Sequence, residues 1–385
     1  MKLRAIVTLS LICLRSCSLW CQQQPPEELK PIIDQLDKLA TDLVKDPTEA
    51  SFTIGLVQKN GLVWSKSYGY ADIESKRPAN ADSVYRIGSI TKQFTALMLL
   101  QLVHDGKVHL SDPVEKYLPE IHQVQGEYKN APPITLVQLA THTAGLDREP
   151  ENMETYVKGP VSDWEKILIS ALPHTKYLYE PGTRFSYSNI GYAILGAALS
   201  RAAKQPYTEY VKQKILLPLG MTHSDFELTA ALQPNMTTGY DRDENNKVHP
   251  ETAAQEHKAG RGYKVPNGAL YTTVGDMAKF VAFELHGGPE SVLPDKELEE
   301  NSRRLVASDP GLNFGYGIGF LIQRKDTKEV VGHSGAVAGY LAAAFFRPDA
   351  STGIILLHNE IDPAITKLLQ IFWEKLEVKS PAVQK

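Results

Sequence analysis

Strand patterns lie at the two ends of the 385-residue chain, and the long stretch between them has helical and loop-like patterns. Near the start, apolar residues at helical spacing over Ile32–Leu43 precede an expected hairpin over Ser51–Tyr70, with Asn60-Gly61 as its turn. Near the end, four strand-like runs precede a final helix that opens at Asp362-Pro363. These patterns favour one antiparallel sheet built from both ends of the chain, with a helical region inserted between them.

The expected fold class is therefore mixed α/β (α+β), an antiparallel sheet flanked by helices plus an all-helical subdomain. The sheet region is expected at about 28–88 and 290–380, and the helical and loop region at about 89–289. The four expected strands near the end are Gly317–Gln323, Glu329–His333, Leu341–Phe346 and Gly353–Leu357. The polar stretch Tyr240–Thr252 is expected to be a loop.

Charge and composition exclude several classes of protein. A net charge of −4 and 42% hydrophobic residues are ordinary for a globular chain, so neither a nucleic-acid binder nor a disordered chain is expected. All three cysteines, Cys13, Cys17 and Cys21, lie in the first 21 residues. If that segment is removed, disulfides, cysteine nucleophiles and cysteine–zinc sites are excluded.

Residues 1–21 are typical of a secretory signal peptide. Lys2 and Arg4 precede a short apolar run, which is too short to span a bilayer. The chain is therefore expected to be secreted or periplasmic, with no integral membrane span after signal removal. Lipid attachment at Cys17 is less favoured, because Arg15 interrupts the pattern that such a site needs.

Ser89 and Lys92 stand three positions apart where a helix is expected to begin, one that ends at Gly106. Residues at i and i+3 share a helix face, so the lysine amine can lie beside the serine oxygen. A serine hydroxyl becomes a nucleophile when a neighbour accepts its proton, and N–H groups at a helix start favour a developing oxyanion. The same spacing also arises by chance, so alone it does not identify a catalytic serine.

Tyr187 and Asn189 precede an apolar helical run that starts at Ile190. A tyrosine beside a lysine ammonium is expected to lose its proton more easily, so Tyr187 could shuttle protons. The Asn189 amide can donate and accept hydrogen bonds at once. Alone, this pattern also fits an ordinary turn ahead of a helix.

His333, Ser334 and Gly335 fall at the end of an expected strand. Gly335 would let a ligand approach the backbone closely, and a strand edge offers unpaired N–H groups. A single histidine in this position is, by itself, more often structural than catalytic.

Taken together and in this order, the three motifs resemble those of the serine β-lactamase and penicillin-binding protein superfamily. The Tyr-x-Asn form is similar to the class C β-lactamase-related branch, whose peptidases, esterases and amidases include members with a His-x-Gly third motif. The resemblance covers about residues 29–378. Flanking segments that share it are Tyr85-Arg86-Ile87-Gly88, Thr141-His142-Thr143-Ala144-Gly145-Leu146, Pro218-Leu219-Gly220-Met221 and Gly268-Ala269-Leu270-Tyr271-Thr272-Thr273.

The resemblance implies a role for each motif residue. Ser89 would attack the substrate carbonyl and form the acyl-enzyme, while Lys92 would hold or relay its proton. Tyr187 would act as general base and later as acid to the leaving group, and Asn189 would bind an amide of the substrate. The N–H groups of Ser89 and Ala336 would form the oxyanion hole.

His333, Ser334 and Gly335 would contact substrate along the strand, but the third motif departs from that of penicillin-hydrolysing relatives. These carry a lysine where this chain has His333, and an unperturbed histidine is mostly neutral at pH 7. Efficient β-lactamase action is therefore not expected, and His333→Lys is expected to raise the affinity for penicillins.

The expected function is a secreted serine hydrolase that acts through an acyl-enzyme on amide or ester bonds, as β-lactamases, D-alanyl-D-alanine carboxypeptidases and esterases do. Its partner would be a small-molecule or peptide substrate, and no cofactor or metal is expected. The calcium-like run from Asp241 lacks the glycine and the final glutamate that such a loop needs. The alternative is a relative without turnover, which binds penicillin or cell-wall peptides or acts as a scaffold.

Overall fold

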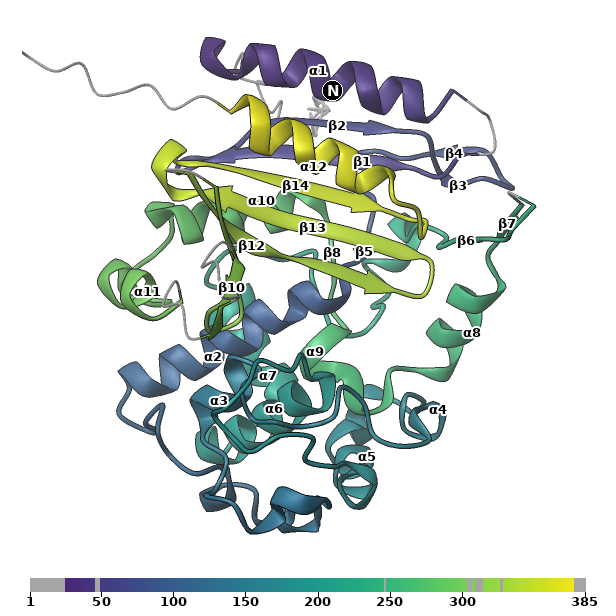
Figure 1. The fold of residues 1–385 in the computed structure, drawn as a ribbon. Coiled ribbons are helices and arrows are strands. Elements are labelled where there is room, and N and C mark those ends of the chain that lie inside the picture. The colour runs from purple at the N-terminus through teal and green to yellow at the C-terminus, as the bar shows by residue number, and fades with distance from the viewer. Residues whose placement is uncertain are drawn as a thin grey trace, which may run out of the picture.

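The computed structural model describes residues 25–45, 49–245, 247–302, 307–308, 314–325 and 328–376. The expected signal peptide, residues 1–21, and the last part of the expected sheet region, residues 377–380, lie outside the described residues. Figure 1 shows a twisted sheet with two helices on its outer face and the mainly helical region on the other side. Within the described ranges, no helix has both the length and the apolar character needed to cross a membrane.

The main sheet is antiparallel and contains eight strands in the described ranges, in the order β2-β1-β14-β13-β12-β11-β10-β9. Their bounds are β1 Phe52–Gln58, β2 Gly61–Tyr68, β9 Ala307–Ser308, β10 Phe314–Tyr316, β11 Leu321–Lys325, β12 Lys328–Val337, β13 Tyr340–Arg347 and β14 Thr352–His358. Strand β1 pairs directly with β14, with Phe52 opposite His358. The predicted sheet shared by both ends of the chain is confirmed.

The first of the four expected C-terminal strands was placed wrongly. The run Gly317–Gln323 is divided, because β10 ends at Tyr316 and β11 begins only at Leu321. Between them the chain turns, with the N–H of Gly317 donating to the carbonyl of Phe320 at 2.8 Å and Gly319 at φ +84°. The apolar residues in this turn are buried, which gave them the pattern of a strand.

Helices α1 (Lys30–Leu43) and α12 (Ala364–Lys375) pack against each other on the outer face of the sheet. Their apolar stripes form one core cluster with the outward side chains of the strands, including Leu36, Leu356 and Leu368. Because an amphipathic helix is stable only when its apolar face is covered, this layer requires both ends of the chain.

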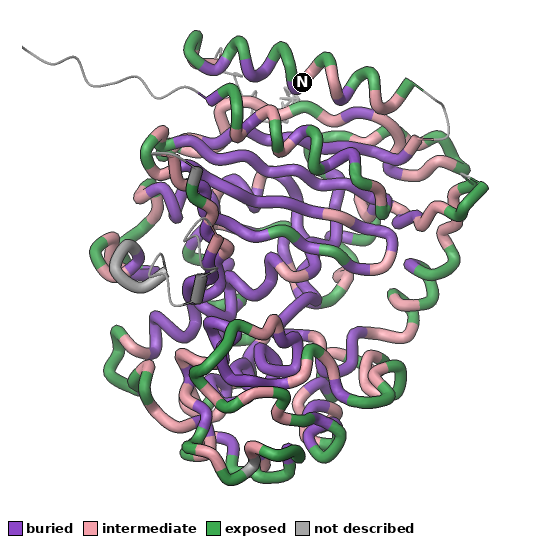
Figure 2. Tube along the Cα trace, viewed as in Figure 1, coloured by how far each residue is buried: buried purple, intermediate pink, exposed green. Residues whose placement is uncertain are grey.

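The opposite face of the sheet is covered by α10 (Val274–Ala282), which contacts β1, β2 and β14. Beyond it lie α2 (Thr91–His104) and α6 (Asn189–Ala203), which are buried on nearly all sides, as Figure 2 shows for the centre of the molecule. The helical and loop region was expected to end at about residue 289. Helix α10 lies within that range but packs on the sheet.

Shorter elements complete the middle of the chain. The remaining helices are α3 Leu136–Ala140, α4 Met153–Tyr156, α5 Trp164–Ala171, α7 Tyr207–Val211, α8 Glu251–Ala259, α9 Val265–Gly268 and α11 Asp295–Ser302. The remaining strands are β3 Tyr70–Asp72, β4 Arg77–Pro78, β5 Tyr85–Arg86, β6 Asp241–Arg242, β7 Val248–His249 and β8 Tyr271–Thr272. The stretch 240–252, expected to be a loop, therefore contains a small two-stranded ribbon and the start of α8, because backbone pairing does not require apolar side chains.

Asn359, just after β14, ties the two ends of the chain to the middle. Its Oδ1 accepts hydrogen bonds from the N–H and the hydroxyl of Ser51, both at 2.7 Å. Its Nδ2 donates to the carbonyls of Tyr70, Ala71 and Thr238, the last at 2.7 Å. The Asn359 side chain is fully buried, so its hydrogen bonds to Ser51 and Thr238 join the start of β1 to the middle of the chain in a place that water does not reach.

We expect Asn359→Ala to lower the free energy of unfolding by about 2–4 kcal/mol, because it leaves several buried polar groups unsatisfied. Urea denaturation followed by circular dichroism measures this. Asn245→Ala, at an exposed turn, is the matched control and should change stability by less than about 0.5 kcal/mol. Equal stability of the two variants would contradict the role assigned to Asn359.

Candidate active site

Ser89 lies in a 3₁₀ turn, Gly88–Ile90, that leads directly into α2. The N–H of Ile87 donates to the carbonyl of Leu270 at 3.2 Å, and the hydroxyl of Thr91 donates to the carbonyl of Gly88 at 2.7 Å. The N–H of Leu270 donates back to the Thr91 hydroxyl at 3.2 Å. These contacts hold the serine turn against the segment that carries β8, one of the flanking segments singled out from the sequence.

Lys92 lies one turn after Ser89 on α2 and is fully buried. Its Nζ is 3.1 Å from Ser89 Oγ, 2.7 Å from Asn189 Oδ1 and 3.0 Å from the carbonyl oxygen of Asn267. The structure thus brings together Ser89, Lys92 and Asn189, which were predicted from the sequence. It adds Asn267, which lies in the short helix α9.

Burial lowers the pKa of Lys92 well below its usual value of 10.5. The cations Lys264, Arg148 and Arg261 lower it further, and the carboxylate of Glu149 opposes them. This environment favours the uncharged amine over the ammonium ion.

Asn189 is the first residue of α6, and the Ser188 hydroxyl caps that helix by accepting the N–H of Gly191 at 2.9 Å. The Asn189 side chain accepts from Lys92 through Oδ1, and its Nδ2 donates to Glu149 Oε1 at 2.6 Å. Both ends of the amide therefore have partners within the protein. Its predicted contact with a substrate amide stays a prediction.

Glu149 holds the Asn189 side chain in place through its carboxylate. Besides Asn189, its carboxylate accepts hydrogen bonds from Tyr263 and from Lys264, the latter at 3.1 Å. Asn267 Nδ2 donates to the backbone carbonyl of Asn189 at 2.9 Å. The rotamer of Asn189, and through it the position of Lys92, is therefore fixed by residues 149 and 263–267.

Tyr187 is half-buried beside Lys92, whose Nζ lies 4.9 Å from the centroid of the tyrosine ring. Burial raises the pKa of Tyr187 to about 12, and a hydrogen bond with Ser89 opposes this shift. The expectation that Tyr187 loses its proton more easily is therefore not met. The physical reason is that burial removes water from the phenol, while burial also lowers the pKa of Lys92 and so disfavours the ammonium that was expected to lower the pKa of Tyr187.

His142 fixes the backbone on both sides of Tyr187. Its carbonyl accepts the N–H of Ser186 at 2.7 Å, and its Nδ1 accepts the N–H of Ser188 at 3.0 Å. The His142 ring lies 4.2 Å from the Tyr187 ring, centroid to centroid. His142 holds a left-handed backbone (φ +57°), a conformation that is costly for a residue with a Cβ.

The third motif lies on β12, where side chains alternate between the two faces of the sheet. His333 is 2% exposed, and its Nε2 lies 3.0 Å from the hydroxyl of Tyr316. Burial lowers the pKa of His333 to about 3, so the ring is neutral at pH 7. Ser334 and Ala336 have exposed side chains on the outer face of the sheet. The predicted substrate contacts of these residues stay predictions.

Gly335 allows β12 to pass directly against the serine turn. A Cβ at this position would lie 1.9 Å from the carbonyl oxygen of Ile87 and 3.0 Å from the N atom of Ser89. A Cβ on Gly88 would lie 2.8 Å from the N atom of Ala336. Because both glycines lack a Cβ, the backbones of Ser89 and Ala336, the predicted oxyanion-hole residues, approach each other closely.

The register of β11 explains why the edge of β12 next to the serine turn is not paired with a strand. Strand β11 pairs with β12 only as far as Gly332, so β12 has no described strand on that side from His333 onward. The serine turn occupies this place.

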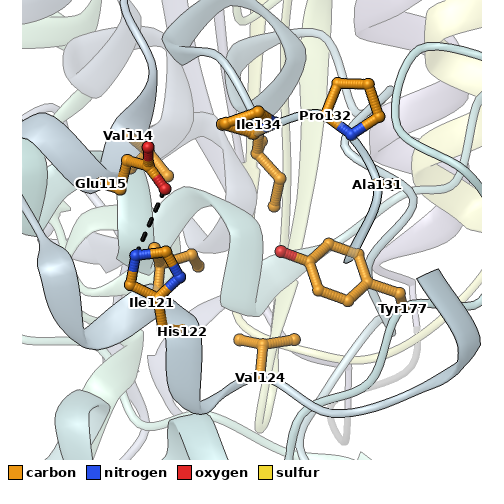
Figure 3. A pocket seen from close by; sticks show the side chains of 10 residues that line it. Val114, Glu115, Ile121, His122, Val124, Ala131, Pro132, Ile134 and Tyr177 are labelled. Atoms are coloured by element: carbon orange, nitrogen blue, oxygen red, sulfur yellow. Dashed lines mark ion pairs between the residues drawn. The ribbon is translucent and has the colours of Figure 1, made fainter. Parts of the chain in front are cut away.

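Two hollows in the described part of the chain lie apart from Ser89, Lys92 and Tyr187. A cavity of about 70 Å³ lies in the helical region, and Glu115 and His122 on its wall are 3.3 Å apart. Figure 3 shows this ion pair together with Tyr177, another of the lining residues. This volume is too small for a typical substrate site. A larger groove of about 510 Å³ lies on the outer face of the sheet beside α12, and Ser334 and Ala336 are among its lining residues.

Across the described ranges, no group of three or more His, Cys, Asp or Glu residues is placed to hold a metal ion.

A family model described as Beta-lactamase matches residues 36–365, a span that contains every residue of the site. The chain belongs to the beta-lactamase family. Its fold is that of penicillin-binding proteins: it is similar to the octameric penicillin-binding protein homologue from Pyrococcus abyssi, with a TM-score of 0.72 and 25% identity. That comparison covers 89% of this chain and 77% of the other.

The chain is also similar to two curated proteins. Protein flp of Staphylococcus aureus (strain COL) is 29% identical over 323 residues, which are 82% of this chain and 61% of the relative. Beta-lactamase-like protein 2 of Dictyostelium discoideum is 30% identical over 333 residues, 83% of this chain and 58% of the relative. The chain thus spans about three fifths of the length of these two relatives.

The buried histidines predict how stability depends on pH. Burial also holds the pKa of His142 well below its usual value of 6.5, so both His142 and His333 are neutral in the folded protein. Below about pH 6.5 the unfolded chain binds protons at these positions and the folded chain does not. The resulting stability is complete above pH 6.5 and is lost as the pH falls towards the folded-state values.

We expect His333→Gln to reduce the pH dependence of the unfolding free energy by about 0.7 kcal/mol per pH unit at pH 6.5, rising towards the one-proton limit of about 1.4 kcal/mol per pH unit near pH 5. Chemical denaturation at several pH values measures the slope. His122→Gln removes an exposed histidine and serves as the control. An unchanged slope in the His333 variant would mean that this ring is not held neutral.

Proposed function

We propose that this protein is a serine hydrolase that cleaves amide or ester bonds of small-molecule or peptide substrates through an acyl-enzyme on Ser89. The observation that carries the proposal is the buried Lys92 amine at 3.1 Å from Ser89 Oγ. An uncharged amine has two N–H donors and one lone pair. The carbonyl oxygens of Asn189 and Asn267 accept the two donors, which leaves the lone pair for the serine hydroxyl.

In this mechanism Ser89 attacks the substrate carbonyl carbon while its proton passes to Lys92. The oxyanion is stabilised by the N–H groups of Ser89 and Ala336, which Gly88 and Gly335 allow to approach each other. Tyr187, a phenol that holds its proton, donates it to the leaving group, and the Lys92 ammonium returns a proton to the tyrosinate. Water then attacks the ester carbonyl, so that the acid is released and Ser89 is restored.

This assignment gives Lys92 the role of base in acylation and Tyr187 that of acid, since burial disfavours both the charged amine and the charged phenolate. We propose no substrate narrower than an amide or an ester. The four residues Ser89, Lys92, Tyr187 and Asn189 can serve the hydrolysis of β-lactams, D-peptides and simple esters alike. We also propose that the protein is secreted or periplasmic, on the strength of the signal-like residues 1–21.

We expect Ser89→Ala to abolish turnover of a p-nitrophenyl ester and to abolish the corresponding mass adduct. Intact-mass spectrometry during turnover of the ester, and separately of a penicillin, measures both. An adduct on the wild type that then decays supports hydrolysis. A single burst followed by a stable adduct would instead support the alternative, a binding relative without turnover. No adduct with either compound would overturn the acyl-enzyme proposal.

We expect Lys92→Arg to lower kcat/KM for the ester by about 10²–10⁴-fold, because a guanidinium keeps the positive charge but accepts no proton at neutral pH. Steady-state kinetics measures the loss, and circular dichroism checks that the variant is folded. Lys107→Arg, the same change on the exposed surface, should leave kcat/KM unchanged. Equal activity of both variants would show that Lys92 acts only through its charge.

A further inference from the structure

Arg148 lies on the segment that runs beside the start of α6, although no motif in the sequence points to it. Its carbonyl accepts the N–H groups of Asn189 and Ile190, at 2.9 and 3.3 Å. The preceding residue, Asp147, is held in the same way, because its carbonyl accepts the Ser188 hydroxyl at 2.6 Å. The main chain at Arg148 is therefore fixed to the segment that carries Tyr187.

The Arg148 side chain is exposed and lies over Tyr187. Its Cζ is 5.0 Å from the centroid of the tyrosine ring, a distance at which a guanidinium is attracted to the ring face. Among the described residues, no carboxylate lies within ion-pair distance of this guanidinium. Its donors are therefore available to a ligand in solution.

The adjacent carboxylate does not neutralise Arg148. The Glu149 carboxylate accepts hydrogen bonds from Asn189, Tyr263 and Lys264, and its ion pair with Lys264 is 3.1 Å long. Lys264 is thereby compensated, whereas Arg148 is not.

The third motif supplies no cation to this site. His333 is buried and its ring is engaged with Tyr316, so it carries no positive charge that a substrate could meet at pH 7. Arg148 is thus an exposed, permanently charged group in direct contact with the ring of Tyr187.

We propose that Arg148 binds an anionic group of the substrate beside Tyr187, so that the enzyme prefers carboxylate-bearing esters or amides to neutral ones of similar length. A guanidinium matches a carboxylate with two parallel hydrogen bonds, which gives both affinity and orientation. The proposal deepens the proposed hydrolase function and rests on it, and it names the substrate class by charge.

The first test measures binding without turnover. In a Ser89→Ala background, calorimetry compares mono-4-nitrophenyl glutarate, which carries an anionic acyl group, with the neutral 4-nitrophenyl pentanoate. A second pair of esters, 4-acetoxybenzoate and its neutral methyl ester, carries the carboxylate or its neutral counterpart on the leaving group instead of the acyl group. Adding Arg148→Gln should weaken binding of an anionic ester by about tenfold, the size of one charge-assisted hydrogen bond, and leave its neutral partner within about twofold.

Arg184→Gln is the matched control, since Arg184 is also exposed and stacks on a tyrosine, Tyr179, at 5.0 Å. It should change none of the affinities, and Arg148→Lys should restore part of the preference for the anionic ester. The pair that responds shows whether the anion belongs to the acyl group or to the leaving group.

The second test measures kcat/KM for the same esters with Ser89 intact, where the anionic-to-neutral ratio should fall by about tenfold in Arg148→Gln. Equal effects on anionic and neutral esters, or no effect on either pair, would overturn the assignment of Arg148. Absence of turnover by the wild type would overturn the hydrolase proposal, while the binding comparison would still decide the role of Arg148.

Discussion

The buried amine of Lys92 is the group on which the rest of the site depends. An amine without water is stable only if its hydrogen bonds are satisfied by the protein, and its three partners come from residues 89, 189 and 267. Helices α2 and α6 and the segment around α9 must therefore converge at one point. This requirement accounts for two central helices that are buried on nearly all sides and yet carry polar residues at their N-terminal ends.

A second constraint is the close approach of two backbones. Strand β12 passes the serine turn so closely that Gly335 and Gly88 have no room for a Cβ. This contact requires a free edge on β12, which exists because β11 pairs only up to Gly332. The edge is held in place by a sheet that both ends of the chain build together, so the layers that cover the outer face of the sheet also support the site.

The charges around the site differ from what the third motif by itself suggests. In the penicillin-hydrolysing proteins that the sequence resembles, the first residue of that motif is a lysine. Here the residue is His333, buried against Tyr316, and the exposed cation beside Tyr187 is Arg148 on a different segment. The same fold thus presents a cation to the site from the helical side of the molecule instead of from the sheet.

The sequence by itself determined the elements and the order of the motifs. Alternating and helical spacings gave the first hairpin, the helices at both ends and the sheet they share, because these patterns are local. The Ser89–Lys92 proximity also followed from helical spacing alone. One strand was misplaced, since the buried residues of the turn at Gly317–Phe320 have the same pattern as a strand.

Only the tertiary structure decided which groups surround these residues and which protonation state these surroundings favour. His142, Glu149 and Asn267 act through hydrogen bonds to residues far away in the sequence, so no local pattern marked them, although His142 lies in a segment that carried the resemblance. The high pKa of Tyr187 likewise arises from burial, which no spacing reveals. Local periodicity predicts on which face of a helix or strand a residue lies. Its burial and its hydrogen-bond partners are properties of the packed molecule, and these determine the protonation state and the chemistry of the side chain.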